Sequence, residues 1–227
     1  LAQGEFVMLG GLVMVSAHVS LGLPLLLAFP VTVLVVTLVG ILLDRLAIRP
    51  IRKPSVMTLI IATVPASIII KGVAMLIWGK SPYDLPAFSG RTPIDIGGVI
   101  IQPQYLWVIG FLVLVAVGLT FFFNRTILGK AMGACADNPD AARLVGINVR
   151  HMVLLSFALS AAIGAVAGLT LTPIALMDYD RGAMLAIKGF GAAILGGLGS
   201  FPGAILGGLI LGLIESLSAG MLASGYK

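Results

Sequence analysis

Long apolar runs separated by short polar loops dominate this chain. The first run, residues 6–43, contains no Asp, Glu, Lys or Arg. It is too long for one membrane span of about 20 residues, and Pro24 and Pro30 interrupt it. The pattern therefore predicts a first helix over residues 5–21 and a second over 24–43. Further apolar helices are predicted over residues 55–78, 104–123 and 152–172.

The last apolar run, residues 189–222, is interrupted around Gly199, Ser200 and Pro202. We interpret it as a short or re-entrant piece followed by a full helix over residues 203–222. The count is then about six apolar segments. The expected fold is all-α: a polytopic transmembrane helical bundle with broken or re-entrant helices, in one domain covering residues 1–227.

Composition narrows the function classes. Apolar residues make up 59% of the chain and charged residues 10%, against about 45–50% and about 25% in soluble domains. Such a chain cannot cover a core with a wetted surface, which excludes a soluble enzyme, a disordered tail and a typical nucleic-acid binder. Cys135 is the single cysteine, and His18 and His151 lie far apart. We therefore expect a lipid-embedded protein without a disulfide framework, a metal site or a cofactor.

The loops differ in charge, and this difference predicts orientation. Residues 44–54 carry a net charge of +3 and residues 124–151 a net charge of +2, whereas residues 79–103 and 173–188 are neutral. Loops rich in Lys and Arg stay in the cytoplasm. The first two loops are therefore predicted to be cytoplasmic and the other two external.

The long cytoplasmic loop, residues 124–151, is the most informative stretch. Residues 130–136 favour a short helix, and Asn138-Pro139-Asp140 favours a cap before a second short helix over 140–145, which Gly146 closes. Ala134, Ala141, Ala142 and Leu144 give this pair a small apolar surface that favours docking onto a partner. The alternative is an ordinary loop between helices. The candidate docking residues are Lys130, Ala134, Asp137, Ala141, Ala142 and Gly146.

Three stretches carry a resemblance to a known family. Residues 129–148 resemble the cytoplasmic coupling loop of the bacterial branched-chain amino acid permeases, the membrane subunits of an ATP-binding-cassette importer. The start, residues 1–10, resembles their early Asn-Phe-Ala-His-Gly-Glu motif, without the preceding Asn and with Gln3 in place of His. Residues 190–204 resemble their late Gly-rich motif. Gly133 stands where many relatives carry Arg, and the first span and C-terminal end of the family are expected to lie outside this sequence.

The resemblance implies the fold of a type II importer permease that translocates leucine, isoleucine and valine across the bacterial inner membrane. It implies four kinds of partner: a second permease subunit in a homo- or heterodimer, two cytoplasmic ATP-binding subunits, an external substrate-binding protein and the lipid bilayer. The chain itself is not expected to be an enzyme. Gly79-Lys80-Ser81 matches the end of a phosphate-binding loop, but Ala74 replaces its first Gly. Transport of urea or short amides, an ion-coupled secondary transporter and a membrane scaffold are the alternatives.

Broken helices suggest where cargo passes. Backbone N–H groups at a helix start attract a carboxylate, and irregular backbone at membrane depth lies in protein or lines water. The candidate pathway residues are Gln3, Gly4, Glu5, Gly197, Gly199 and Ser200. Tight packing through Gly199, Gly203 and Gly207, spaced by four, is the alternative. Lys71 and Glu215 are charged residues within spans, for which we expect structural or interfacial roles.

Overall fold

The structure is a computed structural model that describes residues 2–49, 56–90, 94–96, 99–197 and 199–223. For residues 56–62, 94, 96, 99–101, 201, 222 and 223 it describes the backbone alone. The helices, with π-helical turns labelled η, are α1 (Ala2–Val15), η1 (Ser16–Ser20), α2 (Leu25–Leu43), η2 (Asp44–Ile48), α3 (Val56–Trp78), α4 (Pro103–Arg125), α5 (Ile127–Asp137), α6 (Pro139–Leu144), α7 (Val149–Leu171), α8 (Arg181–Gly196) and α9 (Phe201–Ala223). The strands are β1 (Ile94–Ile96) and β2 (Val99–Ile101).

Among the described residues, five helical segments are long and apolar enough to cross a bilayer, and α3 contributes an apolar stretch over Thr63–Trp78. The predicted helical bundle is confirmed, with one addition: β1 and β2 form a small antiparallel hairpin in the loop before α4. The five segments are Ala2–Ser20, Leu25–Ile48, Pro103–Arg125, Val149–Leu171 and Pro202–Met221.

Both of the first two spans end in a π-helical turn, which extends the second span beyond its predicted end at residue 43 to Ile48, whereas the first ends at Ser20, close to the predicted residue 21. The Leu21 N–H donates to the Ser16 carbonyl at 2.9 Å, and the Arg49 N–H donates to the Asp44 carbonyl at 2.8 Å. These are the i→i+5 bonds of a π-turn. Pro24 directly precedes α2, whereas Pro30 lies inside it. Pro24 is therefore the break between the two spans.

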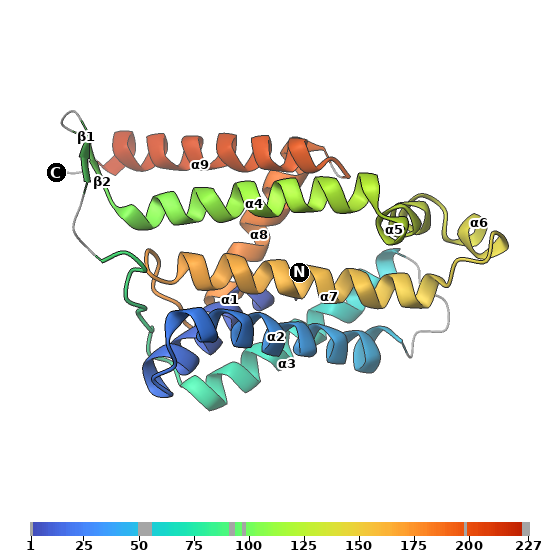
Figure 1. Ribbon diagram of the computed structural model, residues 1–227, viewed down its shortest axis with the longest axis horizontal. Helices are drawn as coiled ribbons and strands as arrows, with labels where there is room; N and C mark the ends of the chain where they lie inside the picture. Colours follow the sequence, from blue (N-terminus) through green and yellow to red (C-terminus); the bar gives the residue numbers. More distant parts are fainter. Residues whose placement is uncertain (1, 50–55, 91–93, 97–98, 198, 224–227) are drawn as a thin grey trace.

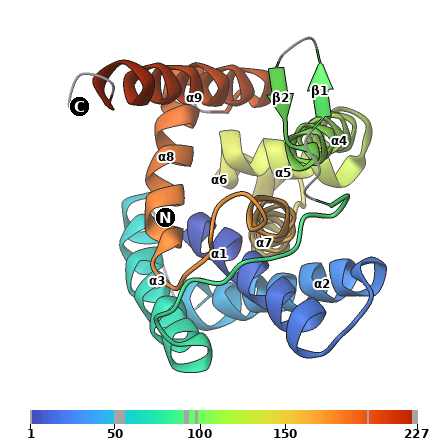
Figure 2. The ribbon, with the colours of Figure 1, turned by 90° about the vertical axis from the view of Figure 1, so that its left-hand side faces the viewer.

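The core lies where α1, α2 and α7 pack together (Figures 1 and 2). Small residues let these backbones approach closely, as is common between membrane helices. A Cβ atom added to Gly10 of α1 would lie 2.6 Å from the Cα of Ala165 in α7. Phe6, Met8 and Leu12 of α1 are fully buried beside this contact. α1 is thus the central helix of the bundle despite its short length.

The two ends of the bundle carry different structures. In Figure 1 the hairpin lies at one end and α5 with α6 projects at the other. The loop before α4 and the loop after α7 meet at the hairpin end, because Tyr83 of the first and Met177 of the second exchange backbone hydrogen bonds of 2.8 and 3.0 Å. This arrangement agrees with the prediction that residues 79–103 and 173–188 share one side. Residues 50–54 and Arg91, which the charge argument used, lie outside the described residues.

The predicted loop over residues 173–188 is too long, since α8 already begins at Arg181. α8 crosses from α1 and α3 to α9, and Figure 2 shows it between them. Its 16 residues span about 24 Å, less than a hydrocarbon core of about 30 Å. α8 is the short piece expected before the last helix, displaced toward the N-terminus.

Candidate functional site

The first candidate pathway residues, Gln3, Gly4 and Glu5, lie in the first turn of α1. The Gln3 side chain exchanges hydrogen bonds with Ser160 of α7, donating to its carbonyl at 3.3 Å and accepting from its hydroxyl. Gly4 is a close-packing position, because an added Cβ would lie 2.7 Å from the Cβ of Ala186 in α8. The structure therefore assigns Gln3 and Gly4 to contacts between helices.

Glu5 is the polar group of this turn that is not fully satisfied. Its side chain is only 1% exposed. One oxygen, Oε1, accepts a hydrogen bond of 2.7 Å from Ser67 of α3. The other, Oε2, has no partner among the described residues and packs against the α-carbon of Gly182. A buried carboxyl oxygen without a donor is costly, and such atoms occur at functional sites.

Lys71 lies one turn further along α3 and forms an ion pair with Asp180. Of the structural and interfacial roles expected for Lys71, this ion pair favours the structural one, because the side chain turns to the residue that precedes α8. Asp178 holds the start of α8 in place: its Oδ1 accepts from the backbone N–H of Asp180 at 2.9 Å and of Arg181 at 3.0 Å. Glu5, Ser67, Lys71 and Asp180 thus form one polar cluster where α1, α3 and α8 meet.

The second candidate group, Gly197, Gly199 and Ser200, forms the turn between α8 and α9. Gly197 and Gly199 have φ angles of 86° and 96°, which side-chain-bearing residues rarely adopt. The N–H groups of Gly197 and Ser200 already donate within the turn, to Ile194 and Gly197 at 3.1 Å each. The Ser200 hydroxyl accepts from Gly203 at 3.2 Å as an N-terminal cap of α9. Two of the N–H groups expected to face a carboxylate are therefore already used.

The structure does not bring the two candidate groups together. Glu5 contacts Gly182 at the start of α8, whereas Gly197 follows its end. Fifteen residues of helix correspond to roughly 22 Å. If both groups contact cargo, they do so at two places separated along α8, which crosses the bundle from α1 to α9 (Figure 1).

A further pair of charges was missed from the sequence. Lys188 was placed in an external loop, but it lies in the middle of α8 and forms an ion pair with Glu215 of α9. Glu215, for which a structural or interfacial role is expected, is therefore a partner of α8. The sequence did contain a signal that residues 180–188 are helical. Lys188 follows Asp180 by eight residues, a little over two helical turns, so the two charges lie on one side of a helix.

The candidate coupling loop folds as predicted, with local capping. The Asn138 side chain accepts from the backbone N–H groups of Asp140 at 3.1 Å and Ala141 at 3.0 Å, and caps α6. Gly146 closes α6 with a φ of 84°. One expectation is wrong: Ala142 is only 3% exposed and packs within the chain, so it is not available to a partner. The other candidate docking residues are exposed, namely Lys130, Ala134, Asp137, Ala141 and Gly146.

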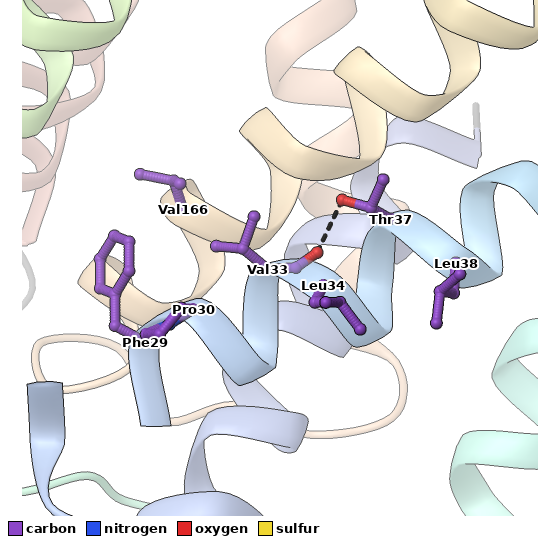
Figure 3. A pocket seen from close by; sticks show the side chains of 7 residues that line it. All are labelled: Phe29, Pro30, Val33, Leu34, Thr37, Leu38 and Val166. Atoms are coloured by element: carbon purple, nitrogen blue, oxygen red, sulfur yellow. Dashed lines mark hydrogen bonds between the residues drawn. The ribbon is translucent and has the colours of Figure 1, made fainter. Parts of the chain in front are cut away.

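Two apolar grooves flank α7. One, about 440 Å³, lies between α2 and α7 and is lined by Phe29, Pro30, Val33, Leu34, Thr37, Leu38 and Val166 (Figure 3). Its single hydroxyl, on Thr37, already donates to the Val33 carbonyl at 2.6 Å. The other, about 160 Å³, lies between α4 and α7. Neither groove offers a charged group to an amino acid. Within the described residues, no group of three His, Cys, Asp or Glu side chains is placed to hold a metal ion.

Comparison with known proteins gives a consistent result. A family model described as branched-chain amino acid transport system / permease component matches residues 1–226. The high-affinity branched-chain amino acid transport system permease proteins LivH of Escherichia coli and BraD of Pseudomonas aeruginosa are each 33% identical, over 100% of this chain and 78% of their own length. The ribose import permease protein RbsC of Haemophilus influenzae is 28% identical over 95% of this chain and 67% of its own. No solved structure matches.

The family model and the matches to LivH and BraD agree with the three resembling stretches and with the helical fold. The chain belongs to the family of branched-chain amino acid transport system permease components.

Proposed function

We propose that this chain is the membrane permease subunit of an ATP-binding-cassette importer that moves leucine, isoleucine and valine across the bacterial inner membrane. The observation that carries the proposal is the capped helix pair α5–α6, which projects from one end of a bundle of apolar spans. Such a pair suits a subunit that receives motion from a partner. LivH and BraD, named as branched-chain amino acid permeases, support the cargo.

The chain is a multi-pass membrane protein of the inner membrane, in agreement with the prediction. It works in a membrane complex with ATP-binding and substrate-binding partners. We propose the composition that the resemblance implied: a second permease subunit, two ATP-binding subunits and one external binding protein. ATP hydrolysis takes place on the partners, and the exposed Leu144, Val145 and Ala141 supply the surface that meets them.

The candidate pathway residues remain part of the proposal, with changed roles. Glu5 is placed to act on the pathway from a buried position, because its side chain is 1% exposed and its Oε2 has no partner among the described residues, next to Lys71 and Asp180. Gln3 and Gly4 position α1 against α7 and α8. Gly197, Gly199 and Ser200 shape the turn at the other end of α8, about 22 Å away. Urea, short amides and ion coupling are less favoured, since the names of LivH and BraD mention none of them.

The test is ATP-dependent uptake by the reconstituted complex. The permease is co-expressed with the ATP-binding subunits and its permease partner, purified, and placed in proteoliposomes with ATP inside and the external binding protein outside. We expect uptake of labelled leucine that excess isoleucine or valine suppresses and that excess ribose or urea leaves unchanged. Omitting ATP is the control. Uptake that follows an imposed proton or sodium gradient without ATP would support the ion-coupled transporter instead.

A further inference from the structure

Charged side chains among the apolar helices gather along α8. Residues 103–124 of α4 and 152–171 of α7 contain no Asp, Glu, Lys or Arg. α8 instead carries Lys188 in its middle and begins directly after Asp180. Lys71 of α3 pairs with Asp180, and Glu215 of α9 pairs with Lys188. Two ion pairs thus connect α8 with two different helices.

These ion pairs are not enclosed by the chain itself. The carboxylates of Asp180 and Glu215 are 63% and 53% exposed. Met184, between the two pairs, is 50% exposed. Asp180, Met184 and Lys188 are spaced by four and lie on one side of the helix, which we call the α8 polar side. Hydrocarbon does not solvate ions, so charged groups among apolar spans face protein or water. The α8 polar side is therefore turned away from lipid.

The end of α8 near Glu5 has a surplus of acceptors. Two carboxyl groups, of Glu5 and Asp180, lie close to one ammonium group, that of Lys71. Glu5 Oε2 is buried and without a partner in the described part of the chain. A second ammonium group would complement these two carboxyl groups, because an ammonium group donates up to three hydrogen bonds to carboxyl oxygens.

We propose that the α8 polar side lines the route of the cargo and that its two ion pairs are successive contact points for the charged ends of an α-amino acid. The proposal rests on the proposed function. The cargo ammonium group binds at the exposed carboxylate of Asp180, beside the buried carboxyl group of Glu5, and the cargo carboxylate binds at Lys71. Eight residues along the helix, about 12 Å away, Lys188 and Glu215 offer the same two charges. Each ion pair satisfies its own charges when empty, so cargo exchanges one ionic contact for another and is not held tightly.

The experiment measures whether water reaches the α8 polar side. In a Cys135→Ser background of the full complex in proteoliposomes, Met184→Cys is treated with a charged thiol reagent. The matched control is Leu213→Cys, which is 62% exposed and lies two residues from Glu215, on the opposite side of α9. Only the thiolate reacts, and it forms in water, so we expect labelling of Met184→Cys to be at least about tenfold faster. Leucine with binding protein and ATP should change this rate.

Equal, slow labelling of both variants would overturn the proposal, because the α8 polar side would then be dry. If Met184→Cys does not assemble, Ile187→Cys, 67% exposed on the adjoining part of α8, takes its place with the same expectation. The labelling rate measured without cargo does not depend on which cargo the complex carries. A complex that shows fast labelling at Met184→Cys but no leucine uptake would contradict the proposed cargo and leave the water-lined route standing.

A second variant separates a cargo contact from a mere link between helices. Lys188→Met combined with Glu215→Gln removes both charges at similar side-chain length, while the close contact of Gly196 with Gly203 still joins α8 to α9. At equal membrane abundance and equal co-purification of the ATP-binding subunits, we expect leucine uptake to fall about tenfold, since the route loses its charged contacts. Uptake within twofold of the unmodified complex would overturn the role of this pair.

Discussion

Gly182 has no side chain where the Glu5 carboxyl group needs room. A Cβ atom added there would lie 3.1 Å from the Glu5 Cα and would overlap the unpartnered Oε2. Gly182 belongs to the first turn of α8, so the absence of a side chain lets α8 approach α1. At this position a single methyl group decides whether two helices and a buried carboxyl group fit together.

We predict that Gly182→Ala destabilises the permease by about 1–3 kcal/mol, the usual cost of an overpacked contact. Thermal unfolding of the purified protein measures the effect as a lower midpoint. Gly189→Ala is the matched control, because it lies on the same helix and a Cβ there meets no described atom within 4 Å. If both variants unfold at the same temperature, α8 does not depend on this close approach.

The turn between α8 and α9 allows a second test at single-residue resolution. Gly199 has a φ of 96°, so any side chain adds backbone strain of about 1–3 kcal/mol. Gly199→Ala and Gly199→Leu share that strain and differ only in side-chain volume. If cargo passes this turn, leucine uptake at equal abundance should be markedly lower for Gly199→Leu than for Gly199→Ala. Equal uptake by the two variants would show that the turn only connects helices.

Gly118 provides a further reference for that comparison. It lies within the span α4, and a Cβ there meets no described atom within 4 Å. Gly118→Leu should therefore affect uptake less than Gly199→Leu. Strong loss in both variants would indicate a general sensitivity of the bundle to bulky residues rather than a blocked route.

At the scale of elements, the helix pair α5–α6 gives different roles to two neighbouring residues that the sequence analysis both assigned to docking. Ala141 is exposed, whereas Ala142 is buried. We predict that Ala141→Glu leaves the helix pair folded but weakens leucine uptake relative to ATP hydrolysis, because a charge is then desolvated at the contact with the ATP-binding subunit. Uptake and hydrolysis measured in the same proteoliposomes give the ratio. Normal coupling in Ala141→Glu would remove this residue from the docking surface.

Ala142→Glu should behave differently, because its charge is buried within the permease itself. Placing an unpaired carboxylate there destabilises the loop fold. We expect faster backbone hydrogen exchange over residues 139–145 in Ala142→Glu and little change in Ala141→Glu. Identical exchange in both variants would contradict the inward orientation of Ala142.

At the scale of the whole molecule, orientation follows from the loops. Ser89 lies at the hairpin end, where it accepts a hydrogen bond of 2.7 Å from Trp107 Nε1, and Asn138 lies between α5 and α6. Both residues are exposed. In a Cys135→Ser background, Ser89→Cys should react with an impermeant thiol reagent added outside intact cells, whereas Asn138→Cys should react only after permeabilisation. The reverse pattern would invert the topology.

The sequence predicted the spans, the capped loop and the family. A bilayer requires about 20 consecutive apolar residues with an internally bonded backbone, so hydropathy alone locates most spans to within a few residues. The caps at Asn138 and Gly146 are equally local, because each depends on neighbours within four positions. The motifs at residues 1–10, 129–148 and 190–204 indicated the permease family, which the comparisons confirm.

The start of α8 was less predictable. Residues 181–188 contain Arg181 and Lys188, which lowered their hydropathy and made them look like loop. In the structure these residues form helix, because Asp178 holds the first turn and Glu215 pairs with Lys188. A charge with a partner on a neighbouring helix is tolerated at a depth where an unpaired charge is costly.

The sequence by itself thus determined what is local or set by the solvent: the apolar spans, the charge difference between loops and the caps of the short helices. Only the tertiary structure decided which side chains meet. Ser67 lies 62 residues from Glu5, and Glu215 lies 27 residues from Lys188. The energy of a buried charge depends on the group opposite it, and that group is fixed only when the helices pack. For this reason the roles of Glu5, Lys71 and Lys188 could not be assigned before the fold was known.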